Sequence, residues 1–170
     1  TYKLDVKDVD FAELDAVIRK YVPSGMAVRS SVSKLVSDEL KDKVYKVCQD
    51  INDVDGYMRH LKSIGSLGGG NHFLEINKDK DGYLWLSVHC GSRNFGKKIC
   101  EYHQDKAIKV YQKRIDEKRA YALSQIEPKD RQAWLQANVS GSKLPEDLRY
   151  LDGEDLDLYV EHMKVAEEFA

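Results

Sequence analysis

A run of three glycines at positions 68–70 limits how this chain can fold more than any other feature of its sequence. Glycine buries no side chain and loses the most backbone entropy on ordering, so core packing does not explain three in a row. Such a run suits a backbone that bends sharply or lies against a ligand. Asn71 and His72 follow directly, and His89 comes after a second strand-like run. The sequence therefore places a candidate site within residues 64–100.

The hydrophobic pattern predicts an α+β fold, in which antiparallel strands pack with several helices. Residues 73–76 and 83–88 are predicted to be two paired strands, joined by a hairpin turn at residues 79–82. Helices are predicted at residues 10–22, 37–51, 54–64, 95–124 and 128–141, and in a final segment that begins near residue 153 and includes Phe169. Residues 26–37 are predicted to be mostly loop.

Length and composition favour one globular unit. The 170 residues suit a single domain with a sizeable core, and no apolar run is long enough to cross a bilayer. A net charge of −2 argues against broad attraction to nucleic acid, although it allows a local basic patch. Three cysteines without a close pair predict a reducing, cytoplasmic setting. Because a helical pattern continues up to Ala170 and the first residue is Thr1, we expect residues 1–170 to be a single segment, truncated at both ends.

The two histidines are candidate metal ligands. If the strands pair through the predicted turn, the start of one lies opposite the end of the other, which brings His72 and His89 to the same rim. Neutral imidazoles suit Zn, Mn, Fe or Ni, but two of them do not complete a site. Regular alternation turns Asn71, Phe73 and Glu75 away from His72, so a common site requires a bulge or twist. The alternative is a tight connecting turn with structural histidines.

The loop at residues 91–96 is a candidate anion site. Backbone N–H groups at the start of the following helix, the Ser92 hydroxyl and the Arg93 guanidinium together suit phosphate. The alternative is that Ser92 caps the helix and Arg93 makes a surface salt bridge.

These residues resemble the signature of RtcB-type RNA-splicing ligases. The resemblance rests on Gly-Gly-Gly-Asn-His-Phe-Leu-Glu at 68–75, on His-Cys-Gly-Ser-Arg at 89–93, and on the stretch from Leu151 through the helix around His162. It implies an incomplete piece of a larger RtcB-like domain. It also implies a ligase that uses Mn²⁺ and GTP to join RNA ends bearing a 2′,3′-cyclic phosphate or 3′-phosphate to 5′-hydroxyl ends, through a histidine-guanylate intermediate.

The resemblance implies roles for individual residues. Mn²⁺ would bind His72 and His89, and Ser92 with Arg93 would hold a phosphate of RNA or nucleotide. The residues implied to form the GTP site are Asn71, His72, Phe73 and Glu75. Besides RNA, the resemblance suggests an archease-like activator as a partner, and no membrane.

The sequence also departs from the family. Its Asp-x-x-Cys-Gly motif, which supplies an aspartate and a bridging thiolate to the metals, has no match, because Cys48 lies in a different context. Cys90 stands where the family usually has serine and is expected to pack rather than ligate. The downstream metal histidine and the guanylylated histidine have no match either, and His103 and His162 are expected to be structural. We therefore expect no catalytic nucleophile in these residues and no ligation by this chain alone.

Two alternatives to the ligase stay open. One is a non-catalytic module of the same fold that binds phosphate or RNA. The other is an unrelated metal-dependent phosphodiesterase that uses His72, His89 and Glu75.

Overall fold

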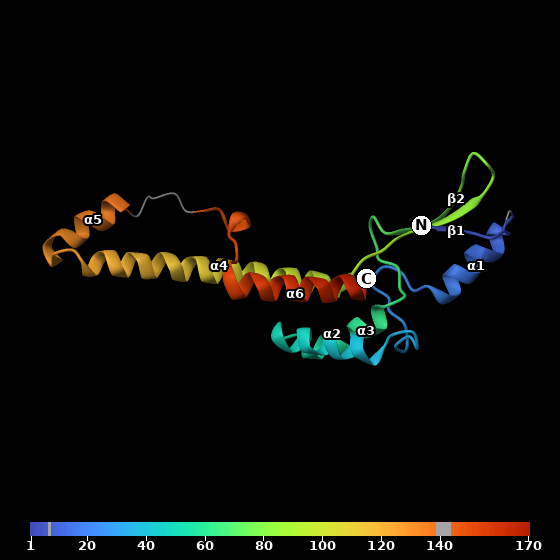
Figure 1. The fold of residues 1–170 in the computed structure, drawn as a ribbon, viewed down its shortest axis with the longest axis horizontal. Coiled ribbons are helices and arrows are strands. Elements are labelled where there is room, and N and C mark those ends of the chain that lie inside the picture. The colour runs from blue at the N-terminus through green and yellow to red at the C-terminus, as the bar shows by residue number, and fades with distance from the viewer. Residues whose placement is uncertain (7, 139–143) are drawn as a thin grey trace. The chain divides into compact units, whose positions relative to one another are not determined.

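The computed structural model describes residues 1–6, 8–138 and 144–170. It forms two compact units, one of residues 1–98 with 161–170 and the other of residues 99–160. Within the described residues the chain has six α-helices and a three-stranded antiparallel sheet (Figure 1). The predicted α+β class is confirmed, and the assignment of both units to one ligase domain stays a prediction.

The helices and strands agree with most of the predicted segments. In chain order they are β1 (Tyr2–Lys3), α1 (Phe11–Tyr21), α2 (Asp38–Asp50), α3 (Tyr57–Ser63), β2 (Phe73–Lys78), β3 (Leu84–His89), α4 (Arg93–Ser124), α5 (Arg131–Asn138) and α6 (Gly153–Phe169). The helix predicted at 54–64 is divided, because a 3-10 turn at Val54–Gly56 precedes α3. The helix predicted at 128–141 begins with another 3-10 turn, and its last three residues lie outside the described part of the chain.

The predicted hairpin is present, and a third strand extends its sheet. β2 and β3 pair antiparallel, with Phe73 opposite His89 at one end. β1 pairs with the other edge of β3, where Lys3 lies opposite Trp85. The two predicted strands are confirmed, but β1 was not predicted, since a strand of two residues is too short to show a period. The ammonium of Lys3, 3.3 Å from the centre of the Tyr83 ring, adds a cation–π contact to this pairing.

Asp79 closes the hairpin turn. Its Oδ1 accepts hydrogen bonds from the backbone N–H groups of Asp81 and Tyr83, at 3.0 and 2.9 Å, and its Oδ2 accepts one from the Trp85 indole at 2.8 Å. The indole hydrogen bond is the largest of the causes that lower the pKa of Asp79 below its ordinary value. Such a carboxylate stabilises the fold above the ordinary aspartate pKa of about 4, and this stabilisation is lost as pH falls through the lower folded value.

We therefore expect the hairpin to loosen in acid below about pH 4, when Asp79 becomes protonated. The fluorescence of Trp85, measured in a Trp134→Phe background, reports this transition. Asp79→Asn is expected to keep the hairpin fold but to lose the acid transition, because its side chain does not titrate in this range. An unchanged acid transition in Asp79→Asn would refute this account of the turn.

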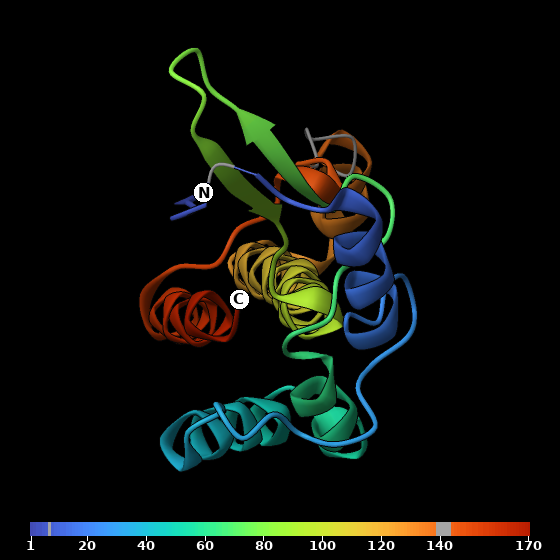
Figure 2. The ribbon, with the colours of Figure 1, turned by 90° about the vertical axis from the view of Figure 1, so that its right-hand side faces the viewer.

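The core of the larger unit holds the first turn of α4 in place. Its buried apolar residues come from α2, α3 and the ends of α4 and α6: Val44, Val47, Cys48, Leu61, Phe95, Ala166 and Phe169. α2 lies beside α3 (Figure 2). His60 and His162 are also buried, and their Nε2 atoms lie 2.6 Å from Asp53 and 3.2 Å from Asp50. These partners agree with the expected structural role of His162, and the packed core fixes the loop that enters α4.

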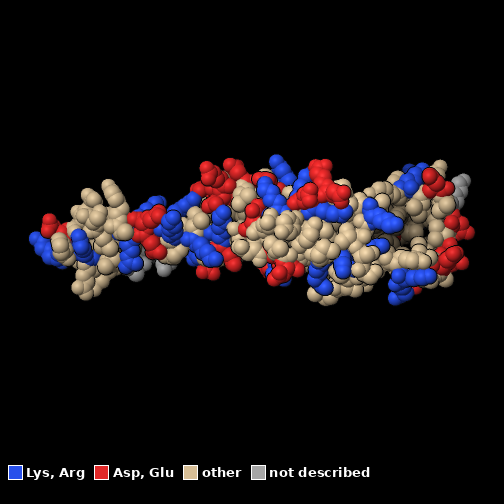
Figure 3. Space-filling view, turned by 90° about the horizontal axis from the view of Figure 1, so that it is seen from below, with Lys and Arg blue, Asp and Glu red and all other residues tan. Residues whose placement is uncertain are grey.

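The smaller unit contains most of α4, α5 and the start of α6. Two ion pairs link α4 to the start of α6: Lys106 with Asp155 at 2.7 Å, and Arg114 with Asp152 at 2.9 Å. Lys and Arg side chains lie interspersed with Asp and Glu on the face drawn in Figure 3. Among the described residues, no helix has the length and apolar composition needed to span a bilayer.

Candidate metal and phosphate site

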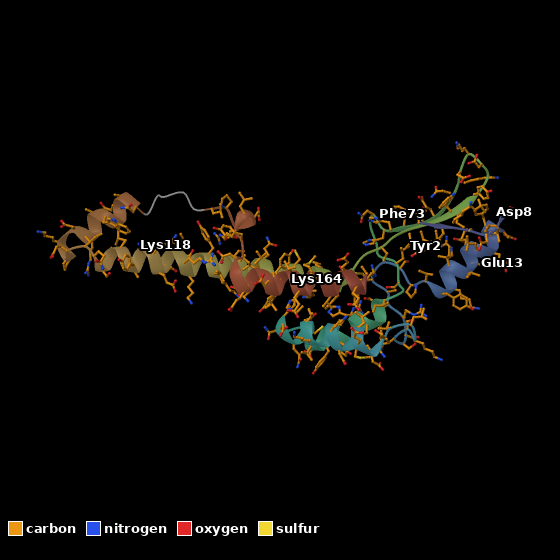
Figure 4. The ribbon with its side chains drawn as sticks, in the orientation of Figure 1. Tyr2, Asp8, Glu13, Phe73, Lys118 and Lys164 are labelled. Atoms are coloured by element: carbon orange, nitrogen blue, oxygen red, sulfur yellow. The ribbon has the colours of Figure 1, made fainter. Side chains whose placement is uncertain are left out.

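His72 and His89 meet at one rim of the hairpin, as the predicted strand pairing requires. Their ring centres lie 5.8 Å apart. Phe73, labelled in Figure 4, begins β2 and stacks on His89, with ring centres 5.4 Å apart and planes inclined by 16°. The hairpin register thus fixes the position of His89, because Phe73 is its direct partner across the two strands.

A backbone contact orients His72. Its Nδ1 lies 2.7 Å from the carbonyl oxygen of Gly69, and since a carbonyl only accepts, Nδ1 carries the proton. The lone pair on Nε2 is then available for a metal, the arrangement typical of ligating histidines. A Cβ atom on Gly68 would overlap the His72 ring, so the bare backbone at Gly68 lets the ring lie against it.

The histidine pair fits a metal ion only as part of a site. Imidazole nitrogen binds first-row transition metals, but Mn²⁺ prefers carboxylate, carbonyl and water oxygen, so it would need such ligands besides the two histidines. In the part of the chain that the structure describes, however, no group of three or more His, Cys, Asp or Glu side chains is arranged to hold a metal. His72 and His89 would supply two ligands at most, and the Oε1 of Glu75 instead accepts a hydrogen bond from Asn77 at 3.1 Å.

A basic pocket of about 650 Å³ lies next to His72. It is enclosed by the turn at residues 25–28, by α3, by the glycine loop and by the start of α4. The basic side chains that line it are Arg59, His60, His72, Arg93 and Lys97. No described carboxylate lines it. A pocket with several cations and no carboxylate suits an anion such as phosphate.

One turn of the backbone anchors two arginines of the pocket. Arg93 donates from Nη2 to the carbonyl of Gly25 at 2.8 Å, and Arg59 donates from Nη2 to the next carbonyl, that of Met26, at 2.9 Å. Both side chains line the pocket and are held in place before any ligand arrives. Such preorganisation reduces the entropy lost on binding.

Arg93 shows two further signs of a functional constraint. Its φ is +54°, a left-handed conformation that costs a non-glycine residue about 1–3 kcal/mol. Its Nε is buried and has no hydrogen-bond partner among the described residues. A buried donor of this kind calls for a ligand, and an anion in the pocket would supply the acceptor. The alternative in which Arg93 makes a surface salt bridge finds no carboxylate partner in the described part of the chain.

The structure brings together some of the predicted site residues. Ser92 lines the basic pocket beside Arg93, with its hydroxyl against Gly96. Of the four residues implied to bind GTP, His72 lines the pocket, whereas Asn71, Phe73 and Glu75 lie outside it. The GTP-binding role of these four residues stays a prediction. Arg59 and Lys97 were not predicted to be site residues, because neither belongs to a motif.

The surroundings of Cys48 and Cys90 agree with packing rather than metal ligation. Burial, and then the charge of Asp53, raises the pKa of Cys48 to about 12, so this thiol stays protonated. Cys90 is half-buried and donates from Sγ to the carbonyl of Ser66 at 3.4 Å. This contact agrees with the expectation that Cys90 packs rather than ligates.

The family model described as "tRNA-splicing ligase RtcB" matches residues 6–170. The chain belongs to the RtcB family. The RNA-splicing ligase RtcB of Escherichia coli K12 is 42% identical over 57 residues, which cover 34% of this chain and 14% of that protein. RNA-splicing ligase RtcB homolog 1 of Entamoeba histolytica is 27% identical over 150 residues, covering 62% of this chain and 28% of that protein. The tRNA-splicing ligase RtcB of Archaeoglobus fulgidus is 33% identical over 94 residues, which cover 45% of this chain and 19% of that protein.

Membership of the RtcB family confirms the resemblance seen in the sequence. The matches cover between 14% and 28% of the length of these three RtcB relatives. The search of solved structures found no match. The alternative of a phosphodiesterase unrelated to RtcB is wrong, because the family match extends over residues 6–170.

Proposed function

We propose that this chain supplies part of the active site of an RNA ligase. The ligase uses Mn²⁺ and GTP to join RNA ends bearing a 2′,3′-cyclic phosphate or 3′-phosphate to 5′-hydroxyl ends, through a histidine-guanylate intermediate. The observation that carries the proposal is the RtcB family match over residues 6–170. The basic pocket supports it, because every substrate of such a reaction presents phosphate groups.

Each group of residues in the site has a separate role in this proposal. His72 and His89 hold Mn²⁺, which when bound polarises phosphate oxygens. Arg59 and Arg93 bind phosphate of RNA and hold it next to the histidines, so that the reacting group is oriented before the chemical step. The nucleotide lies against Asn71, His72, Phe73 and Glu75.

The chemistry of this ligase also requires residues beyond these 170. Neither the Asp-x-x-Cys-Gly motif nor the histidine that accepts the guanylyl group has a match in this sequence. The chain alone therefore seals no RNA. In the cell, the complete ligase acts in the cytoplasm on RNA, with an archease-like activator as a further partner.

The complete reading frame that contains this chain provides the test of ligation. We expect it to seal an RNA with 3′-phosphate and 5′-hydroxyl ends only when both Mn²⁺ and GTP are present. His72→Ala is expected to abolish sealing, and Lys80→Ala, at the exposed turn of the same hairpin, to leave it unchanged. Failure of the complete protein to seal, or sealing by the 170-residue chain alone, would contradict the proposal.

The basic pocket also supports a second candidate, a module that binds phosphate or RNA without chemistry. The specific observation is that five basic side chains and no described carboxylate line the pocket. Both candidates predict RNA binding by this chain. Only the ligase predicts sealing by the complete protein, so the sealing test separates them.

RNA binding by this chain is expected to depend on Arg59. Loss of a charge-assisted hydrogen bond costs about 1.5–3 kcal/mol, so Arg59→Ala is expected to weaken binding of an RNA with a 3′-phosphate at least about tenfold. Lys62→Ala is the matched control, because Lys62 lies on the same helix, α3, but does not line the pocket. Fluorescence anisotropy with labelled RNA measures both affinities. Equal losses in the two variants would show that binding depends on overall charge rather than on this pocket.

A further inference from the structure

The smaller unit has a pocket of its own, of about 310 Å³. His103 and Ala107 of α4, which are only 3% and 4% exposed, contribute to its lining. The His103 ring lies 5.1 Å from the ring of Tyr159, which also lines the pocket. Tyr150 and Leu156 contribute exposed parts of the lining, with 61% and 42% of their surface accessible. The pocket thus combines buried and exposed apolar side chains.

The segment that forms one side of this pocket is held in a defined position. The backbone N–H of Leu144 donates to the Tyr111 hydroxyl at 3.0 Å, and the guanidinium of Arg149 lies 5.2 Å from the centre of the same ring. The ion pairs of Lys106 with Asp155 and of Arg114 with Asp152 fix the start of α6 against α4. The pocket is therefore formed before a ligand binds, which lowers the cost of binding.

Charge distinguishes this pocket from the basic pocket of the larger unit. The basic side chains near the pocket are already paired with carboxylates. Arg149 pairs with Glu146, Lys106 with Asp155 and Arg114 with Asp152. By contrast, the exposed carboxylate of Asp147, which lines the pocket, has no cation partner among the described residues. The unpaired charge at the rim of the pocket is thus negative. It repels the phosphates of RNA and favours a partner that carries Lys or Arg.

Exposed apolar side chains gather around the same rim. Leu148 and Tyr150 are 63% and 61% exposed, and Leu156 and Val160 are each 42% exposed. Leu156 and Val160 are four residues apart on α6 and so share one face of the helix. Exposed apolar groups around a preformed pocket with a polar rim are typical of a protein-binding surface.

We propose that this surface binds a segment of a partner protein in which a large apolar side chain is flanked by Lys or Arg residues. The apolar side chain fills the pocket over His103 and Ala107 and contacts Tyr150 and Leu156. A flanking cation pairs with Asp147. A buried apolar anchor within a rim of complementary charge is how many protein interfaces obtain both affinity and specificity.

A synthetic peptide tests this proposal with the full 170-residue chain. The probe is the labelled hexapeptide Lys-Arg-Leu-Trp-Lys-Arg, and Glu-Asp-Leu-Trp-Glu-Asp serves as its acidic control. We expect saturable binding of the basic peptide at a ratio of one to one, weakened by salt, and no binding of the acidic one. Absence of saturable binding of the basic peptide, or equal binding of both peptides, overturns the proposal.

Variants of the chain locate the binding. Leu156→Ser and Asp147→Asn are each expected to lower the affinity for the basic peptide at least fivefold. Tyr121→Ser is expected to bind it as the parent chain does. Tyr121 is a matched control because it is 71% exposed on α4 and does not line the pocket. Equal thermal midpoints would show that the variants fold; if Leu156→Ser unfolds, Asp147→Asn alone decides. Unchanged binding in the folded pocket variants overturns the proposal.

Two other occupants are outcomes of the same experiments. Binding of a ten-residue oligouridylate that Leu156→Ser abolishes would assign the pocket to RNA and overturn the proposal. A dimer of the chain that forms without peptide and is lost in Leu156→Ser would assign the surface to a second copy, and would overturn it as well.

Discussion

Replacing Gly68 by alanine is expected to disrupt the histidine pair and the basic pocket together. A Cβ atom at this position would lie 2.6 Å from Nη1 of Arg93 and would overlap the His72 ring. Neither side chain can move away without cost, because His72 donates to the Gly69 carbonyl and Arg93 to the Gly25 carbonyl. We expect the free energy of unfolding to fall by about 1–3 kcal/mol. We also expect the affinity for RNA with a 3′-phosphate to fall at least about tenfold, since a charge-assisted hydrogen bond of Arg93 is lost.

Gly91→Ala is the matched control for this substitution. Gly91 lines the same pocket, but a Cβ atom there would meet no atom within 4 Å, and its backbone is not left-handed. It is therefore expected to bind RNA as the parent chain does. Urea unfolding and RNA anisotropy provide the two measurements. If Gly68→Ala and Gly91→Ala bind RNA equally, the close approach of His72 and Arg93 to the glycine loop does not matter for the site.

Phe95→Ala is expected to destabilise the larger unit more than any other substitution considered. Phe95 is fully buried in the first turn of α4, and its ring lies 4.8 Å from that of Phe169 and 5.4 Å from that of His60. Removing a buried phenylalanine side chain costs about 3–5 kcal/mol, a large part of the 5–15 kcal/mol that is typical of a folded domain. Because the same turn begins with Arg93, the basic pocket is expected to be lost as well.

An exposed phenylalanine provides the control. Phe11 on α1 is 59% exposed, so Phe11→Ala is expected to change the free energy of unfolding by no more than about 0.5 kcal/mol. Urea unfolding followed by circular dichroism measures both variants. A loss below about 1 kcal/mol in Phe95→Ala would show that this ring does not anchor the core, since buried phenylalanines normally contribute far more.

The parts of the fold that depend on local signals were predictable from the sequence. The alternating pattern of the two long strands and the Asp-Lys-Asp-Gly turn at 79–82 are sufficient to predict the hairpin, and the hairpin in turn predicts that His72 and His89 meet. β1 was not predictable, because two residues carry no period and pair only with a strand far away in the sequence. α4 begins two residues earlier than predicted, at the left-handed Arg93.

The basic pocket was only partly predictable, because its residues come from four separate segments. Ser92 and Arg93 were found through their motif, which lies next to a helix start. Arg59 lies on a different helix, and its place in the pocket depends on the turn that contains Gly25 and Met26. Nothing in the local sequence of that turn indicates two arginines held by consecutive carbonyls. A tertiary contact of this kind becomes visible only in the folded chain.

A calorimetric titration of the chain with Mn²⁺ tests most directly whether the two histidines form a metal site. We expect saturable binding to the parent chain and to Lys80→Ala, a control at the exposed turn of the same hairpin. His72→Ala and His89→Ala are each expected to weaken binding at least about tenfold, because each removes one of the two imidazoles. Absence of binding to the parent chain, or binding that neither histidine substitution changes, would contradict the proposal that this rim of the hairpin holds the metal of an RNA ligase.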